Sequence, residues 1–211
     1  MSSLEILTFP NPFLRRAARP VEVFDDALAA LVEEMAALMH AQDGVGLAAT
    51  QVGRDMQLLI LSSYVFLSPE ERARVGEEPE WRGEDIAVLN PRVVAQSADE
   101  LTDTEGCLSF PEVYIKVARP RWVKIEAQDA RGAALTLEGE GFAARAILHE
   151  MDHLSGKVMT DRLSFLAREA ALNKHRRVQR ALEERRQREE RAAAPRAPSA
   201  ARRVALSSAK K

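Results

Sequence analysis

Apolar residues recur at helical spacing in three stretches of the chain. Residues 25–42 place leucine, valine and methionine on one stripe, and Asp25 or Asp26 is suited to cap its start. Residues 142–154 carry alanine, isoleucine and leucine among polar positions. Residues 163–191 have the composition of a long, highly charged helix. The pattern therefore predicts three helices, of which the second is partly buried.

Short apolar or alternating runs between the first two helices predict β-strands. Their expected bounds are residues 57–61, 86–89, 93–95, 113–117, 122–127 and 134–137. Asn90-Pro91 is expected to separate the second run from the third, and Gly139-Glu140-Gly141 to end the last. Residues 63–85 have no strong period and predict a surface loop with a helical turn. Because the strands cluster instead of alternating with helices, the sequence favours an α+β fold with antiparallel sheets.

Composition and charge describe how the chain is organised. A length of 211 residues with 46% hydrophobic content suits one domain with an extension. The single cysteine excludes an intrachain disulfide and fits a reducing cytosol, and no secretory signal or membrane-spanning run is expected. Residues 168–211 carry 14 Lys and Arg against 5 Asp and Glu, whereas residues 1–167 carry 16 against 27. We therefore expect a cytoplasmic protein with a catalytic domain over 1–165, a charged helix over 166–191 and a basic disordered tail over 192–211.

An HExxH pattern lies on the helix predicted for residues 142–154. His149 and His153 are four residues apart, so both imidazoles face one side of the helix and can hold one metal ion. Glu150, between them, can then act on a water molecule. Burying these groups without a partner would be costly, which favours a metal site. We expect a metal-dependent hydrolase in which antiparallel β-sheets pack around a central HExxH helix.

The third metal ligand separates the candidate enzyme classes. A metzincin would need a histidine where the chain has Met159. A thermolysin-like peptidase would need a glutamate on a second helix, and Glu169 is the candidate. Cys107 is the better candidate ligand, although a lone cysteine is most often a small buried hydrophobe. The segment Gly44–Gln51 fits a plain tight turn as well as a functional site.

Three segments taken together carry a family resemblance. They read GVGLAATQ at residues 44–51, EGCLS at 105–109 and HEMDHLSG at 149–156. In these segments, and over residues 4–165 as a whole, the chain resembles the peptide deformylases. The resemblance implies removal of the formyl group from the N-terminal formyl-methionine of nascent polypeptides, with release of formate. An HExxH metallopeptidase is the alternative, and a non-catalytic ribosome-binding protein is the third hypothesis.

The resemblance also implies which residues form the site. The metal ligands would be Cys107, His149 and His153. The native ion would be Fe(II), and Zn(II), Ni(II) or Co(II) could replace it. Glu150 would carry a proton from water to the departing amine, and the Gln51 amide and the Leu108 backbone N–H would meet the oxyanion. The residues expected to bind the substrate are Val45, Gly46, Phe142, Ala146 and, through its aliphatic stem, Arg145.

Further residues are expected to support the site or to reach a partner. Glu105 and Arg119 would form an ion pair behind the metal, with an ordinary surface pair as the alternative, and Asp152 would orient a ligand histidine. Leu148 stands where many relatives have glutamine. The basic stretch 174–203 predicts binding to the phosphates of ribosomal RNA, with a solubilising extension as the alternative. The protein is expected to be a monomer that does not bind membranes.

Overall fold

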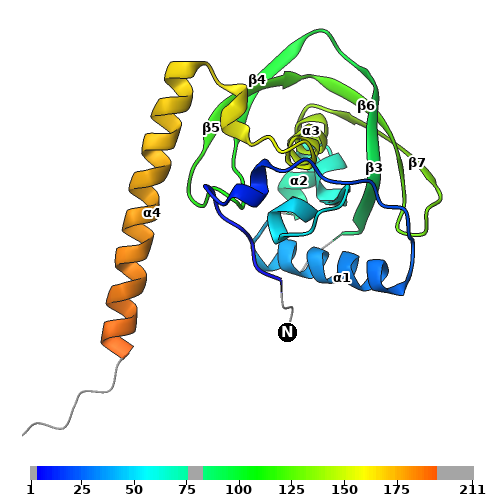
Figure 1. The fold of residues 1–211 in the computed structure, drawn as a ribbon. Helices are drawn as coiled ribbons and strands as arrows, with labels where there is room; N and C mark the ends of the chain where they lie inside the picture. Colours follow the sequence, from blue (N-terminus) through cyan, green and yellow to red (C-terminus); the bar gives the residue numbers. More distant parts are fainter. Residues whose placement is uncertain (1–3, 76–82, 194–211) are drawn as a thin grey trace, which may run out of the picture.

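The structure, a computed structural model, describes residues 4–75 and 83–193 (Figure 1). Its α-helices are α1 (Asp26–Ala41), α2 (Pro69–Val75), α3 (Phe142–Leu154) and α4 (Phe165–Ala193). Its strands are β1 (Gly46–Ala48), β2 (Leu58–Ser62), β3 (Asp85–Gln96), β4 (Glu100–Glu105), β5 (Ile115–Pro120), β6 (Trp122–Gln128) and β7 (Ala134–Glu140). The strands pair antiparallel in the orders β1-β2-β3-β6-β7 and β4-β5, which confirms the predicted α+β fold.

Helix α3 lies at the centre of the molecule (Figure 1). It contacts β1, β2 and β7 of the larger sheet and β5 of the smaller one. Its Ala144 and Ile147 are fully buried in a core that also contains Leu59, Val88 and Ile125 from the larger sheet. The helix occupies the predicted residues 142–154. The expected arrangement of sheets around the HExxH helix is therefore confirmed.

Strand β2 is apolar from Leu58 to Leu61 because it is covered on both faces. Leu59 and Leu61 belong to the core around α3, whereas Leu58 and Ile60 belong to the core around α1. This division follows from the alternation of side chains along a strand. Helix α1 begins where predicted, at a cap in which the Asp25 carboxylate accepts a hydrogen bond of 2.9 Å from the Leu28 backbone N–H. The helix holds β2 and β1 in place beneath the site.

Several strand bounds differ from the predictions. Strand β3 continues through Asn90-Pro91, because the pairing register shifts there and Asn90 adopts φ 51°, so the predicted break is wrong. Strand β7 runs through Gly139 and ends at Glu140, before Gly141, which adopts φ 56°. The short β1 lies within Gly44–Gln51, where the sequence predicted no strand. The strand predicted for residues 113–117 corresponds to β5, which begins at Ile115 and ends at Pro120. Strand β4 was not predicted, because as an edge strand it is mostly polar and exposed.

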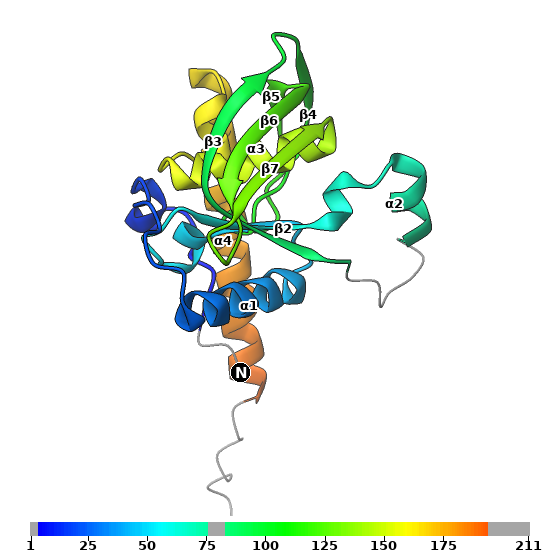
Figure 2. The ribbon, with the colours of Figure 1, turned by 90° about the vertical axis from the view of Figure 1, so that its right-hand side faces the viewer.

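The segment expected to be a loop over residues 63–85 contains more helix than predicted. It begins with a 3-10 helix over Ser63–Phe66 and continues into α2, which stands out from the body (Figure 2). Ser68 and Glu71 cap α2 reciprocally: the Glu71 N–H donates to the Ser68 hydroxyl at 3.2 Å, and the Ser68 N–H to the Glu71 carboxylate at 2.8 Å. Residues 76–82 of the expected loop lie outside the described residues.

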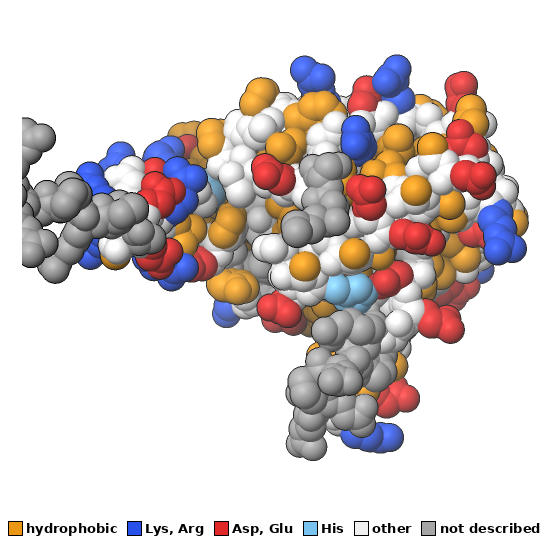
Figure 3. All heavy atoms as spheres, turned by 90° about the horizontal axis from the view of Figure 1, so that it is seen from below, with side chains coloured by type: hydrophobic (Ala, Val, Ile, Leu, Met, Phe, Trp, Pro, Cys, Tyr) orange, Lys and Arg blue, Asp and Glu red, His pale blue; other side chains and the backbone are white. Residues whose placement is uncertain are grey.

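Helix α4 begins at Phe165, two residues later than predicted, and projects beyond the body. Ala171 and His175 in its first half are buried, whereas residues 183–192 are exposed. Basic and acidic side chains are interspersed along this projecting part (Figure 3). None of the helices in the described ranges is both long and apolar enough to cross a membrane. The tail expected over 192–211 lies, from residue 194 on, outside the described residues.

Candidate metal centre

Helix α3 brings the HExxH side chains to the floor of a cleft. Because both sheets cover the helix, His149 is only 8% exposed and His153 only 1%. Burial lowers the pKa of His153 well below its usual range, so its imidazole stays neutral. Neutral imidazole is the form that binds a metal.

The Cys107 thiol meets the two histidines, as predicted. Its Sγ lies 3.3 Å from Nε2 of His153. The potential ligand atoms of Cys107, His149 and His153 all lie within 4.8 Å of one another. A four-coordinate ion with bonds of about 2.0–2.3 Å places its ligand atoms roughly 3.5 Å apart, so the cluster fits such an ion. Two imidazoles and a thiolate suit a divalent transition metal, with a fourth position left for water.

Glu105 lies behind the cluster and contacts His149. One carboxylate oxygen accepts a hydrogen bond of 2.9 Å from His149 Nδ1, which leaves Nε2 free to bind a metal. The same carboxylate forms a two-bond ion pair with Arg119, whose Nη2 donates at 2.9 Å. Burial alone would raise the pKa of Glu105, but its bonds with Arg119 and His149 hold it well below the usual range. The predicted pair is therefore present and buried, and the surface alternative is wrong.

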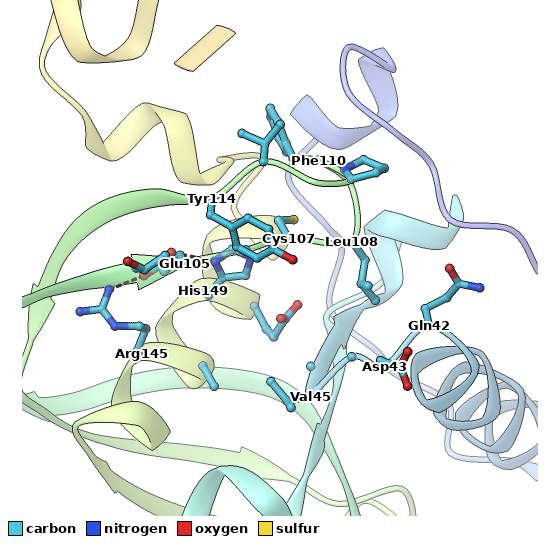
Figure 4. Close-up of a pocket in the computed structure, with 18 of the residues that line it drawn as sticks. Gln42, Asp43, Val45, Glu105, Cys107, Leu108, Phe110, Tyr114, Arg145 and His149 are labelled. Carbon is cyan, nitrogen blue, oxygen red and sulfur yellow. Dashed lines mark hydrogen bonds and ion pairs between the residues drawn. The ribbon is translucent and has the colours of Figure 1, made fainter. Parts of the chain in front are cut away.

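Arg145 and Asp152 extend this charged network; the prediction for Arg145 agrees with the structure, and the one for Asp152 does not. The Arg145 guanidinium turns away from the cleft (Figure 4), donating to Glu105 at 2.7 Å and to the Val117 carbonyl at 2.8 Å. Only its aliphatic stem is left to line the cleft, as expected. The prediction for Asp152 is wrong: its carboxylate accepts hydrogen bonds from Arg119 at 2.8 Å and from Arg162 at 2.9 Å, and Glu105 orients the histidine instead.

Glu150 faces the cleft with a strongly perturbed carboxylate. Burial raises its pKa to about 7, because the charged form has lost its water. Its Oε2 has no hydrogen-bond partner within the part of the chain that is described. Gly46 of β1 packs against it so closely that an added Cβ would come within 2.5 Å of Glu150 Oε1. A glycine is therefore required at position 46 for this carboxylate to lie where it does.

Gln51 approaches the cluster from the turn after β1. Its Oε1 accepts a hydrogen bond of 2.9 Å from the Ala48 backbone N–H, which fixes the orientation of the amide. Its Nε2 then donates to the Ser109 hydroxyl at 3.2 Å and lies 3.6 Å from Cys107 Sγ. The amide N–H groups thus lie beside the candidate metal ligands, where the sequence expected a donor.

The cleft above these residues has a volume of about 560 Å³. Of the predicted site residues, its lining contains Gln51, Cys107, Leu108, His149, Glu150 and the five expected to bind substrate; His153 lies below it. Sequence reasoning missed Asp43 and Tyr114, which lie at its rim (Figure 4). Tyr114 is 62% exposed and stacks on Gly106, where an added Cβ would come within 2.8 Å of the ring. Gly106 belongs to the EGCLS segment, but nothing in that segment indicated Tyr114.

The sequence model of the family described as polypeptide deformylase matches residues 3–169. The chain belongs to the peptide deformylase family. It is 40% identical over 174 residues to the peptide deformylase of Acinetobacter baumannii, covering 82% of this chain and 90% of that protein. It is 39% identical to the enzyme of Phenylobacterium zucineum, covering 82% and 95%. The crystal structure of a peptide deformylase from Legionella pneumophila has a TM-score of 0.73 at 35% identity, covering 85% of this chain and 97% of that one.

Proposed function

We propose that the protein is a metal-dependent hydrolase that removes the formyl group from the N-terminal formyl-methionine of nascent polypeptides and releases formate. Its membership of the peptide deformylase family supports this function. The observation that carries the proposal is the convergence of Cys107, His149 and His153 beside the buried Glu150 at the floor of the cleft.

These three residues are proposed to be the metal ligands. We propose Fe(II) as the native ion, with Zn(II), Ni(II) and Co(II) as possible replacements. When bound, such an ion supplies Lewis acidity, which polarises the formyl carbonyl and makes water a better nucleophile. The bond from His149 Nδ1 to Glu105 places a proton on Nδ1 and aims the other ring nitrogen at the cluster.

Glu150 is proposed to be the general base and then the general acid. Its carboxylate accepts a proton as the water oxygen attacks the formyl carbon, and it returns the proton to the amine as the carbon–nitrogen bond breaks. A carboxylate with a pKa of about 7 is suited to both steps near neutral pH. The buried Oε2, which has no hydrogen-bond partner among the described residues, is consistent with this role.

The Gln51 amide and the Leu108 backbone N–H are proposed to stabilise the oxyanion that forms on the formyl oxygen. The bond from Ala48 to Gln51 Oε1 fixes the amide before substrate arrives. Donors fixed in this way need no reorganisation during the reaction, and one of them is typically worth about 3 kcal/mol.

The methionine side chain is proposed to enter the apolar part of the cleft. The residues proposed to contact the substrate are Val45, Gly46, Phe142, Ala146 and the stem of Arg145. The salt bridge of Arg145 with Glu105 supports this, because it keeps the charge of the guanidinium away from the thioether. The backbone of Gly46 in β1 is proposed to pair with the extended peptide.

The metallopeptidase alternative is not favoured, because the relatives and solved structures that match are peptide deformylases. Mass spectrometry of formyl-Met-Ala-Ser after incubation with the Fe(II)-loaded protein separates the two. We expect loss of the formyl group with every peptide bond intact. Cleavage of a peptide bond with the formyl group retained would reject the proposal.

The C-terminal region is proposed to bind the ribosome. The enzyme is proposed to be a monomer and to act in the cytoplasm. In this proposal residues 1–165 form the catalytic domain, and the helix 166–191 and the tail 192–211 provide the contact. The basic stretch 174–203 supports binding to phosphates, with strong salt dependence. Deletion of residues 183–211, which keeps the buried His175 in place, should weaken co-sedimentation with ribosomes at low salt and leave deformylation of a free peptide intact. Unaltered co-sedimentation would reject the proposal.

A further inference from the structure

The segment between β2 and β3, for which the sequence indicated no function, is fixed to the body at its base. The Ser63 backbone N–H donates to the Glu84 carbonyl at 2.8 Å, and the Glu84 N–H donates to the Ser63 hydroxyl at 3.0 Å. Val65 is 1% exposed and belongs to the core around α3. The first part of the segment is therefore held against the catalytic helix, while α2 extends outwards (Figure 2).

Two side chains of this segment hold the ring of Phe142. The Tyr64 ring meets it edge to face, with centroids 6.4 Å apart and an interplanar angle of 90°. The Arg72 guanidinium carbon lies 5.1 Å from the centre of the same ring. Arg72 is itself fixed by a hydrogen bond of 2.5 Å to the Leu67 carbonyl. Both contacts have the geometry in which an aromatic ring gains attraction beyond simple burial.

Phe142 lines the cleft at the start of the helix that carries the metal centre. Phe142, Ala146 and His149 follow one another at helical spacing, so they share a face of α3. Phe142 lies two turns before His149 and is 37% exposed. Its ring therefore forms an outer wall of the cleft, away from the reacting atoms and open to solvent on one side. Tyr64 and Arg72 both contact this half-exposed ring and so restrict the rotamers that it can adopt.

We propose that Tyr64 and Arg72 determine substrate specificity by fixing Phe142 as the outer wall of the methionine pocket. This inference rests on the proposed function. A wall that is already in place spares the substrate the cost of ordering it, so the two contacts favour binding of a long apolar side chain over a short one. They touch no reacting atom and should act on KM, leaving kcat unchanged. Tyr64 and Arg72 are thus positioning residues in a segment outside the metal-binding motifs.

The test compares Tyr64→Ala and Arg72→Ala with wild type, all loaded with Fe(II) and measured for formate release. We expect each variant to raise KM for formyl-Met-Ala-Ser about threefold to tenfold, with kcat within about twofold. The preference for formyl-Met-Ala-Ser over formyl-Ala-Ala-Ser should fall by a similar factor. Arg74→Ala is the matched control, because Arg74 lies on the same helix and is exposed. Tyr64→Phe keeps the ring edge and should restore the wild-type KM.

Each outcome decides the inference. An unchanged KM and preference in both alanine variants would overturn it, and so would an equal change in Arg74→Ala. A fall in kcat and in thermal stability without a change in preference would mean that the contacts only support α3, which also overturns it. If Tyr64→Phe behaved like Tyr64→Ala, the ring contact would not be the cause. No formate from wild type would refute the proposed function and this inference with it, whereas an active wild type with unaffected variants would refute this inference alone.

Discussion

Helices α3 and α4 both carry many ionisable side chains, but in opposite surroundings. On α3, the charged or polar residues Arg145, His149, Glu150, Asp152 and His153 are at most 8% exposed. On α4, the ion pairs among Glu183, Arg185, Arg186, Glu189 and Glu190 have side chains between 48% and 71% exposed. The same chemical groups thus lie in a nearly dry interior in one helix and in water in the other.

The difference shows where charge is costly in this molecule. A buried charge loses several kcal/mol of hydration and needs partners to recover it, whereas an exposed pair gains little from its partner. Around α3, Glu105, Arg119, Asp152 and Arg162 supply those partners. Among the described residues of α3, the side chains with an unpaired buried atom are Glu150 and His153, which belong to the candidate metal centre. The incomplete pairing of α3 is therefore confined to the place where chemistry is proposed.

The largest effect is expected from removing a proposed metal ligand on α3. His153→Ala should lose bound metal and reduce formate release by more than about 100-fold. Mutating a residue that only hydrogen-bonds to a metal ligand already reduces metal affinity or activity by about 10–100-fold. Metal analysis of the purified protein and a formate assay measure both effects. His175→Ala on α4, which removes another buried histidine, is the control and should keep its metal. Full metal content in His153→Ala would contradict the proposed ligand set.

The next effect concerns the partner network behind α3. Glu105→Gln leaves Arg145 without its buried counter-charge and leaves Arg119 with Asp152 alone, and it should reduce the free energy of unfolding by about 3–5 kcal/mol. It should also weaken metal affinity by about 10–100-fold, because His149 loses its acceptor. Denaturant unfolding and metal titration measure the two effects. Glu183→Gln on α4 is the matched control. Equal stability of the two variants would contradict the conclusion that the buried charge pairs around α3 contribute more to stability than the exposed pairs of α4.

Gly46→Ala, a change in strand β1, should displace the Glu150 side chain of α3. The added Cβ would lie 2.5 Å from Glu150 Oε1, so either the carboxylate or strand β1 must move. Overpacking of this kind costs about 1–3 kcal/mol of stability, and we expect formate release to fall more than metal content. A variant with wild-type activity would mean that the position of Glu150 is not important for catalysis.

The smallest effect is expected on the exposed half of α4. Arg186→Ala removes pairs with Glu183 and Glu190 and should shift the melting temperature by less than about 2 °C, because exposed pairs are screened by water and salt. Deformylation of a free peptide should be unchanged. A shift as large as that of Glu105→Gln would show that the exposed helix contributes to the stability of the body.

The parts of the fold that follow from local pattern were predictable from the sequence. The bounds of α3, the cap of α1 and the apolar run of β2 each depend on neighbouring residues or on a simple period. The polar edge strand β4 and the continuation of β3 through Asn90-Pro91 were not predictable in this way. They depend on pairing with another strand, β4 with the β5 that follows it and β3 with the more distant β6, and not on a period within the strand itself.

The candidate metal ligands were predictable from the three linked motifs. The hydrogen-bond partners of the long charged side chains around them were not. The three segments led to Cys107, His149 and His153, and these do converge. The sequence could not indicate that Asp152 bonds to two arginines, or that the Arg145 guanidinium reaches the carbonyls of Leu101 and Val117. Those contacts depend on how β4 and β5 lie against α3.

The central claim is that the buried carboxylate of Glu150 moves the proton during deformylation. The most direct measurement is formate release from formyl-Met-Ala-Ser by wild type and by Glu150→Gln, both loaded anaerobically with Fe(II) to the same metal content. The account predicts steady formate release from wild type and a rate at least about 100-fold lower in the variant. Equal rates in the two proteins, or no formate from a fully metallated wild type, would contradict it.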